Sequence, residues 1–288
     1  MPEAAPRIPT RDDIRKVIGS GGAANDGRAL PEPSAFPPFL ESPMSNEQDK
    51  IALVTGATRG IGLETVRQLA QQGAHVLLAG RDAGKAEAAA QALRDQGLKV
   101  DAIELDVTDQ ASIGAAARQV RARYGRLDIL VNNAGIARDD IGKPPSQQGL
   151  EVWRETFDTN LFGLVATTQA FLPLLHASAA GRIVNVSSIL GSLALHVDPA
   201  SPIYDFKLPA YDASKSALNA WTVHLAHELR GTTVTVNAVH PGYVKTDMNN
   251  GEGELEIADG ARSSVDMALH GGASANGSFT HLGEVLPW

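Results

Sequence analysis

The chain has 288 residues, a hydrophobic content of 43% and a formal net charge of -8. Its length is ample for a buried core, and its acidic balance excludes a general attraction to nucleic acid or anionic membranes. Because it has no cysteine, disulfides, thiolate catalysis and cysteine-based metal sites are excluded, and the composition is typical of a protein from the reducing cytoplasm. The longest uncharged stretch, residues 159–181, is interrupted by polar residues and a proline, so we expect a buried helix there and no membrane span.

Residues 1–48 differ in composition from the remainder of the chain. They hold eight of its 16 prolines and show little periodic hydrophobicity. A segment of this kind buries too little apolar surface to offset its loss of conformational entropy. We therefore predict a disordered extension at 1–48, followed by one folded domain at 49–288. Met44 stands just before the folded part, which favours a start site assigned too far upstream over a docking tail.

From residue 50 onward, short apolar runs alternate with helical patterns. Strands are predicted at residues 51–55, 75–79, 100–105, 127–131, 182–186, 234–239 and 278–281. The helices predicted between them cover residues 61–72, 83–95, 112–124, 151–177, 210–229 and 257–269. This alternation is typical of an α/β protein with a doubly wound parallel sheet, the Rossmann fold. In such sheets, ligands bind beyond the carboxyl ends of the strands, where most of the motifs below lie.

A glycine-rich loop, T-G-A-T-R-G-I-G at residues 55–62, follows the first strand. Gly56, Gly60 and Gly62 have no Cβ, so the loop can turn tightly and a pyrophosphate can approach its backbone. The free N–H groups at the start of the next helix favour negatively charged phosphates. Because the loop joins a strand to a helix in a βαβ unit, we interpret it as a dinucleotide-binding loop and not as a structural turn.

Three polar residues further along predict a proton-transfer set. Tyr211 and Lys215 are four positions apart, which places them on one face of a helix. An ammonium near a phenol lowers the pKa of the phenol, and Tyr211 can then donate a proton to a carbonyl oxygen as hydride reaches the carbon. Ser188, at the end of the fifth strand, can hold that oxygen near the phenol. Ser187 is the alternative, because strand residues alternate between two sides.

These motifs resemble the short-chain dehydrogenase/reductase family, and the resemblance extends over residues 50–288. Besides the glycine loop and the Y-x-x-x-K pair, it rests on N-N-A-G at 132–135, Asn160 in the long helix, the serine pair and P-G at 241–242. It implies that Ser188 is the functional serine. It also implies that Asn160 joins Ser188, Tyr211 and Lys215 as a fourth catalytic member through a proton relay. A core amide without a catalytic role is the alternative for Asn160.

The resemblance also implies a set of contacts to a nicotinamide cofactor. The glycine loop and the residues that follow the second, third, fourth and sixth strands would form it, together with the tyrosine and the lysine. The expected cofactor-binding residues are Gly56, Thr58, Arg59, Gly60, Ile61, Gly62, Arg81, Asp106, Val107, Asn133, Ala134, Gly135, Tyr211, Lys215, Pro241, Gly242, Val244 and Thr246. An isolated Asp such as Asp106 is more often a turn residue, and Asn133 is expected to stabilise the neighbouring strand edges as well.

The choice between NAD and NADP(H) depends on the end of the second strand. A carboxylate there binds the ribose 2′-OH of NAD, whereas this chain has Arg81, whose guanidinium can pair with a 2′-phosphate. Arg59 can hold the same phosphate from the glycine loop. The family pattern implies NADP(H) for this combination. Asp82 would favour NAD if a shift in loop register brought its carboxylate to the ribose.

The segment between Ser188 and Tyr211 is longer than is usual in the family, and the extra residues fall within 193–209. Together with P-G-Y-V-K-T-D-M at 241–248, this insertion resembles the carbonyl-reductase branch. We expect it to fold over the substrate pocket or along the subunit surface, and it leaves monomer and homo-oligomer both open. The residues expected to shape the pocket are Leu190, His196, Tyr204, Phe206, Tyr243 and Met248.

The sequence therefore predicts an oxidoreductase that reduces a ketone or aldehyde with NADPH, reversibly and by direct hydride transfer. We expect a small-molecule carbonyl or alcohol as its substrate, and neither nucleic acid nor membrane as a partner. No metal is expected, because the histidines lack the spacing of a ligand set. The alternatives are an NAD-linked alcohol, sugar or steroid dehydrogenase and a non-catalytic regulator that senses NADP(H).

Overall fold

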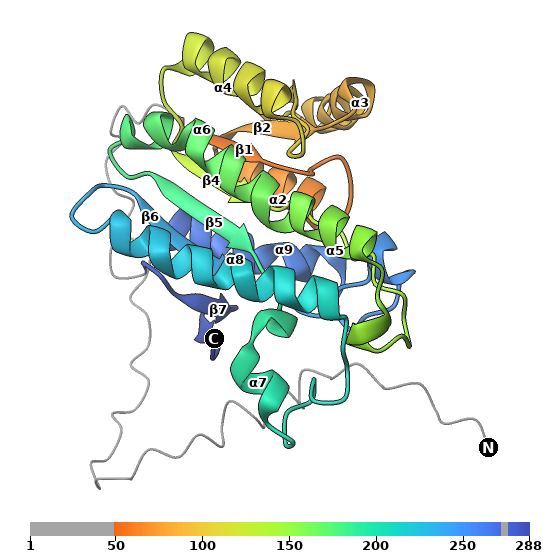
Figure 1. Cartoon of the computed structure of the whole chain (residues 1–288). Helices are drawn as coiled ribbons and strands as arrows, with labels where there is room; N and C mark the ends of the chain where they lie inside the picture. The colour runs from red at the N-terminus through yellow and green to blue at the C-terminus, as the bar shows by residue number, and fades with distance from the viewer. Residues whose placement is uncertain (1–48, 272–275) are drawn as a thin grey trace, which may run out of the picture.

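The computed structural model describes residues 49–271 and 276–288 (Figure 1). The disordered extension predicted at 1–48 lies outside the described residues. Within them, strands and helices alternate as the sequence predicts, and one sheet runs through the middle of the domain. None of the helices in these two ranges is long and apolar enough to cross a membrane.

The described strands form one sheet in the order β3-β2-β1-β4-β5-β6-β7-β8. Their bounds are β1 Ile51–Val54, β2 His75–Gly80, β3 Val100–Glu104, β4 Ile129–Asn132, β5 Arg182–Val186, β6 Thr235–Val239, β7 Phe279–His281 and β8 Glu284–Val285. The neighbours from β3 to β7 pair in parallel, and β8 is antiparallel to β7. Every residue of β1 and β4 is buried, because helices cover both faces of the sheet.

The helices form one layer on each face of the sheet (Figure 1). One layer contains α4 Gln110–Tyr124, α6 Leu164–His176 and α8 Pro209–Glu228, and the other contains α2 Gly60–Gln71, α3 Ala83–Arg94 and α9 Ile257–His270. Successive strand side chains point to opposite faces. Leu53 therefore packs in the cluster that includes Phe171 of α6, and Val54 packs in the one that includes Leu69 of α2. These two clusters are the core of the domain.

The strand order reverses between β1 and β4, which is the position at which open α/β sheets bind ligands. The loops that leave these two strands touch there, since a Cβ on Gly56 would lie only 2.8 Å from Cα of Ala134. Gly56 also has a φ of +62°, a left-handed conformation that favours glycine. The reversal therefore places the glycine loop directly against residues 132–135.

Three elements differ from the sequence-based expectation. The helix predicted at 151–177 is divided into α5 Leu150–Phe157, a π-helical segment at Asp158–Gly163 and α6. A short helix, α7 Leu193–Val197, forms within the insertion, and strand β8 was not expected. A π-helical segment leaves no separate mark in the hydrophobic period, and α7 and β8 are shorter than the windows in which a period is visible.

Candidate functional site

The glycine loop leads into helix α2 with open backbone donors. The N-cap residue Arg59 makes no side-chain capping bond, and the first turn of the helix carries no acidic residue. A Cβ on Gly60 would meet no described atom within 4 Å, whereas a Cβ on Gly62 would lie 2.4 Å from Nδ2 of Asn133. Gly62 thus permits the close packing of the loop, and the space at Gly60 is open. A helix start with open N–H groups and free space at Gly60 fits a phosphate group.

Hydrogen bonds join the glycine loop to the loop after β4. Nδ2 of Asn133 donates to the carbonyl oxygens of Thr55 at 2.8 Å and of Gly56 at 3.2 Å. The Thr55 hydroxyl accepts the backbone N–H groups of Asn133 and Ala134, each at 3.0 Å. Asn133 therefore has the structural role that the sequence suggested, at the edge of the expected cofactor site.

The two serines after β5 face different neighbours. The Ser187 hydroxyl is buried and donates to Oδ1 of Asn219 on α8 at 2.7 Å. The Ser188 side chain instead lies near the phenol of Tyr211 and lowers the pKa of that phenol, and its Oγ accepts the N–H of Leu190 at 3.2 Å. The serine that the family resemblance selected is thus the one that contacts the tyrosine.

Tyr211 lies in the first turn of α8, where an acidic residue from another loop caps the helix. The Asp139 carboxylate accepts the N–H of Ala210 at 2.7 Å and the N–H of Tyr211 at 3.1 Å. These bonds satisfy two of the donors that a helix start leaves open. Asp139 has no signal in the sequence, because its partners lie 71 and 72 positions away in the chain.

Lys215 lies one helical turn after Tyr211 and is almost completely buried, with 4% of its surface exposed. Its Nζ donates to the carbonyl oxygen of Val186 at 2.8 Å and lies 5.6 Å from the centroid of the Tyr211 ring. Burial lowers the pKa of Lys215 to about 8, because the charged ammonium loses its hydration. The amine therefore still carries most of its charge at neutral pH.

The pKa of Tyr211 moves in the direction opposite to the one expected from the ammonium alone. Burial raises it to about 12, the hydrogen bond from Ser188 opposes this rise, and the nearby carboxylates of Asp212 and Asp139 add to it. Desolvation of the phenolate thus dominates in the protein by itself. Tyr211 is a protonated phenol at neutral pH, which is the form that a proton donor needs.

Asn160 is fully buried in the π-helical segment, a helix distortion that often occurs at functional sites. Its Oδ1 accepts the N–H of Ile136 at 2.8 Å, and its Nδ2 donates to the Ile136 carbonyl at 2.8 Å and to the Ser214 hydroxyl at 3.0 Å. Both the oxygen and the nitrogen of the side-chain amide therefore form hydrogen bonds within the protein. These bonds tie the loop after β4 to α8 at the position just before Lys215.

At the end of β2, two neighbouring charged residues differ in their contacts. Asp82 is the N-cap of α3, and its Oδ1 accepts the N–H of Lys85 at 2.9 Å, the bond that chiefly lowers its pKa. Arg81 is exposed and has no hydrogen-bond or ion-pair partner among the described residues. Arg59 pairs through Nη1 with Oδ2 of Asp247 at 2.8 Å, and both side chains are largely exposed. The free cation at this strand end is therefore Arg81, within the described part of the chain.

The other expected cofactor residues lie at the same edge of the sheet, on the loops after β1, β3, β4 and β6. Oδ1 of Asp106 accepts the N–H and the hydroxyl of Thr108 at 2.9 and 2.7 Å, so Asp106 does form a turn. After β6, the N–H of Thr246 donates to Oδ1 of Asn249 at 3.0 Å. The residues that share this edge are Thr58, Ile61, Val107, Gly135, Pro241, Gly242 and Val244.

The insertion packs on the segment that follows Ser188. Leu195 and the fully buried Ile203 form a small apolar cluster with Ile189. Of the residues expected to shape the pocket, Tyr204 is 39% and Met248 is 53% exposed. His196, which lies within the insertion, is instead held by hydrogen bonds to Leu190 and Lys207. It lies next to the buried carboxyl group of Asp212, a residue with no signal in the sequence.

Comparison with known proteins agrees with this arrangement. The sequence model described as short chain dehydrogenase matches residues 50–256. The short-chain dehydrogenase anuI of Penicillium roqueforti is 39% identical over 228 residues, which cover 77% of this chain and 89% of that protein. A (+)-neomenthol dehydrogenase of Arabidopsis thaliana is 36% identical over 280 residues, covering 78% of this chain and 93% of the relative. The structure of an NADPH-bound carbonyl reductase from chicken fatty liver aligns with a TM-score of 0.74 at 30% identity, covering 84% of this chain and 100% of the other.

Proposed function

This chain belongs to the short-chain dehydrogenase family, and from that premise we propose that it reduces a ketone or aldehyde to an alcohol with NADPH. One observation carries the proposal: the Tyr211 phenol lies near the Ser188 side chain, which lowers its pKa, and one helical turn from the buried ammonium of Lys215. These three groups lie at the edge of the sheet where the glycine loop ends. A proton donor, a group that holds the oxygen and a phosphate cradle are what reduction of a carbonyl requires.

Each residue of the proposed site has a separate task. When bound, NADPH supplies a hydride for the carbonyl carbon. Tyr211 donates its phenolic proton to the carbonyl oxygen, which completes the alcohol, and the Ser188 hydroxyl holds that oxygen beside the phenol. Lys215 stabilises the phenolate that remains and holds the ribose hydroxyls of the cofactor. Asn160 supports the proton relay to Lys215 by fixing the backbone at Ile136 and the hydroxyl of Ser214.

Two observations support NADP(H) over NAD as the cofactor. The carboxylate that could bind a ribose hydroxyl, that of Asp82, is engaged in capping α3. The neighbouring Arg81 is exposed and carries a positive charge that suits a 2′-phosphate. In addition, the carbonyl reductase structure that aligns with this chain contains NADPH.

A screen of carbonyl compounds tests the proposed function. The purified protein is mixed with NADPH or NADH and a broad panel of ketones and aldehydes, and oxidation of the cofactor is followed by absorbance. We expect at least one compound to be reduced, with NADPH faster than with NADH. Faster turnover with NADH would indicate an NAD-linked dehydrogenase instead. Tight NADPH binding without turnover of any compound would indicate a regulator that senses the cofactor.

A further inference from the structure

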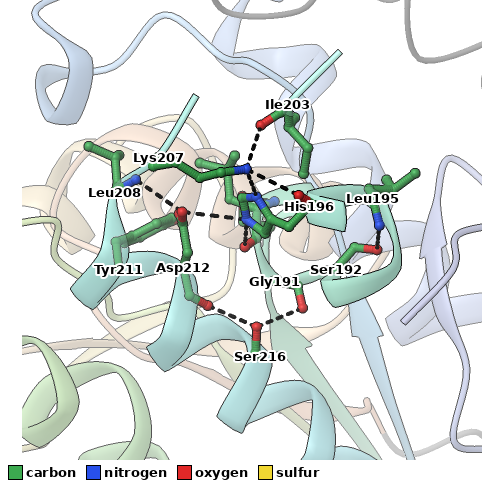
Figure 2. Close-up of polar contacts among 12 residues, drawn as sticks. Gly191, Ser192, Leu195, His196, Ile203, Lys207, Leu208, Tyr211, Asp212 and Ser216 are labelled. Carbon is green, nitrogen blue, oxygen red and sulfur yellow. Dashed lines mark hydrogen bonds and ion pairs between the residues drawn. The ribbon is translucent and has the colours of Figure 1, made fainter. Parts of the chain in front are cut away.

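A polar cluster fastens the insertion to the segments that carry Ser188 and Tyr211 (Figure 2). Its centre is His196 of α7, whose side chain is only 11% exposed. Nε2 of the imidazole lies 2.9 Å from the carbonyl oxygen of Leu190 and 3.4 Å from Oδ2 of Asp212. Leu190 follows Ser188 by two positions, and Asp212 follows Tyr211 directly. One imidazole therefore bridges the two segments on which the proposed chemistry depends.

The neighbours of His196 determine where its proton lies. Nζ of Lys207 is 2.8 Å from Nδ1, and an ammonium can only donate, so Nδ1 accepts and Nε2 carries the hydrogen. Burial lowers the pKa of His196, and the hydrogen bond to Leu190 only partly opposes this. The imidazole is therefore neutral, and its Nε2 hydrogen is donated to the carbonyl oxygen of Leu190. The Asp212 carboxylate contacts the same nitrogen at 3.4 Å, and this contact is not an ion pair.

Asp212 is a buried carboxyl group beside the phenol. Its Oδ2 accepts the N–H of Leu208 at 3.0 Å, and its Oδ1 is buried without a partner among the described residues. The charged or titratable groups that face it are Lys207 and His196 from the insertion, Asp139 from the loop after β4 and Tyr211 from its own helix. Burial, reinforced by Asp139, raises the pKa of Asp212 to about 7. Its charge thus changes near neutral pH, and once ionised it opposes ionisation of the phenol.

We propose that His196 and Asp212 form a positioning pair for Tyr211, an inference that rests on the function proposed above. The pair holds the insertion and the first turn of α8 against the segment after Ser188, so that the phenol and the serine hydroxyl face one substrate oxygen. The ionised Asp212 also keeps the proton on Tyr211 and thereby raises the pH at which oxidation of the alcohol begins. Both residues act through Tyr211 and Ser188.

Amide hydrogen exchange tests whether His196 holds these segments together, and it does not require turnover. His196→Leu removes the bridge, and we expect the amides of residues 190–212 to exchange several-fold faster while exchange in β1, β4 and β5 stays the same. The NADPH dissociation constant should also stay the same. His224→Leu, at an exposed position of α8, is the matched control and should leave exchange unchanged. Equal exchange of residues 190–212 in His196→Leu and the parent protein would overturn the positioning pair.

The pH dependence of alcohol oxidation tests the charge on Asp212. Asp212→Asn keeps the shape and removes the charge, and Glu228→Gln makes the same change at the exposed far end of α8. The rate of alcohol oxidation should increase with pH as the phenol loses its proton. We expect Asp212→Asn to shift this increase to lower pH by about half a unit, so that the rate at a given pH within it is roughly threefold faster. If Asp212 had only a structural role, Asp212→Asn would lower the rate without shifting the pH range over which the rate increases.

The outcomes of these two tests are distinguishable. If the oxidation rate increases over the same pH range in Asp212→Asn, Glu228→Gln and the parent enzyme, the proposed effect of the Asp212 charge is contradicted. A parent protein that turns over no carbonyl or alcohol would refute the proposed function, and the exchange result would still decide whether His196 clamps the insertion. Should His196→Leu fail to fold, exchange in Asp212→Asn decides the same question, because the carboxylate that contacts Nε2 is then lost and residues 190–212 should loosen.

Discussion

Arg81 and Asp82 are adjacent residues with different tasks at the end of β2. Asp82 uses its carboxylate to cap α3. Arg81 extends into solvent at the edge of the sheet where the glycine loop lies. A cofactor with a 2′-phosphate would place a doubly charged group near this guanidinium, and such charge-assisted pairs are among the stronger polar contacts in proteins.

Replacing Arg81 should therefore change cofactor preference. We expect Arg81→Asp to weaken NADPH binding by roughly 10- to 100-fold, about 1.4–2.8 kcal/mol, while NADH binding stays the same or improves. Fluorescence titration with each cofactor measures both constants. Arg230→Asp makes the same charge change beyond the far end of α8 and should alter neither. An unchanged NADPH constant in Arg81→Asp would remove the basis for the NADP(H) preference.

At the scale of elements, the start of α8 depends on a carboxylate from another loop. Asp139 accepts two backbone N–H groups, one of which belongs to Tyr211. Asp139→Ala should lower the free energy of unfolding by about 1–2 kcal/mol, as loss of a helix cap does. It should also slow carbonyl turnover, because the backbone of the proton donor loses a restraint. Asp139→Asn retains an acceptor oxygen and should keep most of the stability. Urea denaturation measures the free energy of unfolding of each variant. Equal stability of Asp139→Ala and the parent would show that the cap contributes nothing.

Most elements of the fold could be predicted from the sequence, because their signals are local. The parallel strands are buried on both faces and read as continuous apolar runs, and the glycine loop and the Y-x-x-x-K pair are short motifs. The contacts of Asp139, His196 and Asp212 could not be predicted, because each depends on a partner from another segment. The rise in the pKa of Tyr211 could not be predicted either, because the burial of its phenol follows from packing and not from its neighbours in the chain.

At the scale of the whole molecule, the proposed site costs stability because it buries charge. Burial lowers the pKa of Lys215 from 10.5 to about 8. Between these values the unfolded chain binds the proton and the folded protein does not, so this group makes stability rise with pH there. Below pH 8 the amine is charged in both states, and the full cost of desolvating it is present.

Lys215→Met should therefore stabilise the protein while it abolishes turnover. We expect the free energy of unfolding near pH 7 to rise by about 1–3 kcal/mol, and the gain over the parent to shrink by about pH 9.5. Denaturant unfolding at both pH values measures this difference. Lys85→Met, at an exposed position of α3, is the control and should change stability little. A Lys215→Met protein less stable than the parent at pH 7 would show that the buried ammonium is net stabilising.

We propose that the phenol of Tyr211 delivers the proton during carbonyl reduction. The most direct measurement determines the NADPH dissociation constant and the carbonyl turnover of Tyr211→Phe on one preparation, beside Tyr124→Phe at the end of α4, where the phenol contacts Asp101 of β3. We predict that Tyr211→Phe loses about 10²- to 10⁴-fold in turnover, the usual contribution of a general acid, with NADPH binding within about twofold of the parent. Tyr124→Phe should retain turnover. Undiminished turnover in Tyr211→Phe would contradict this account.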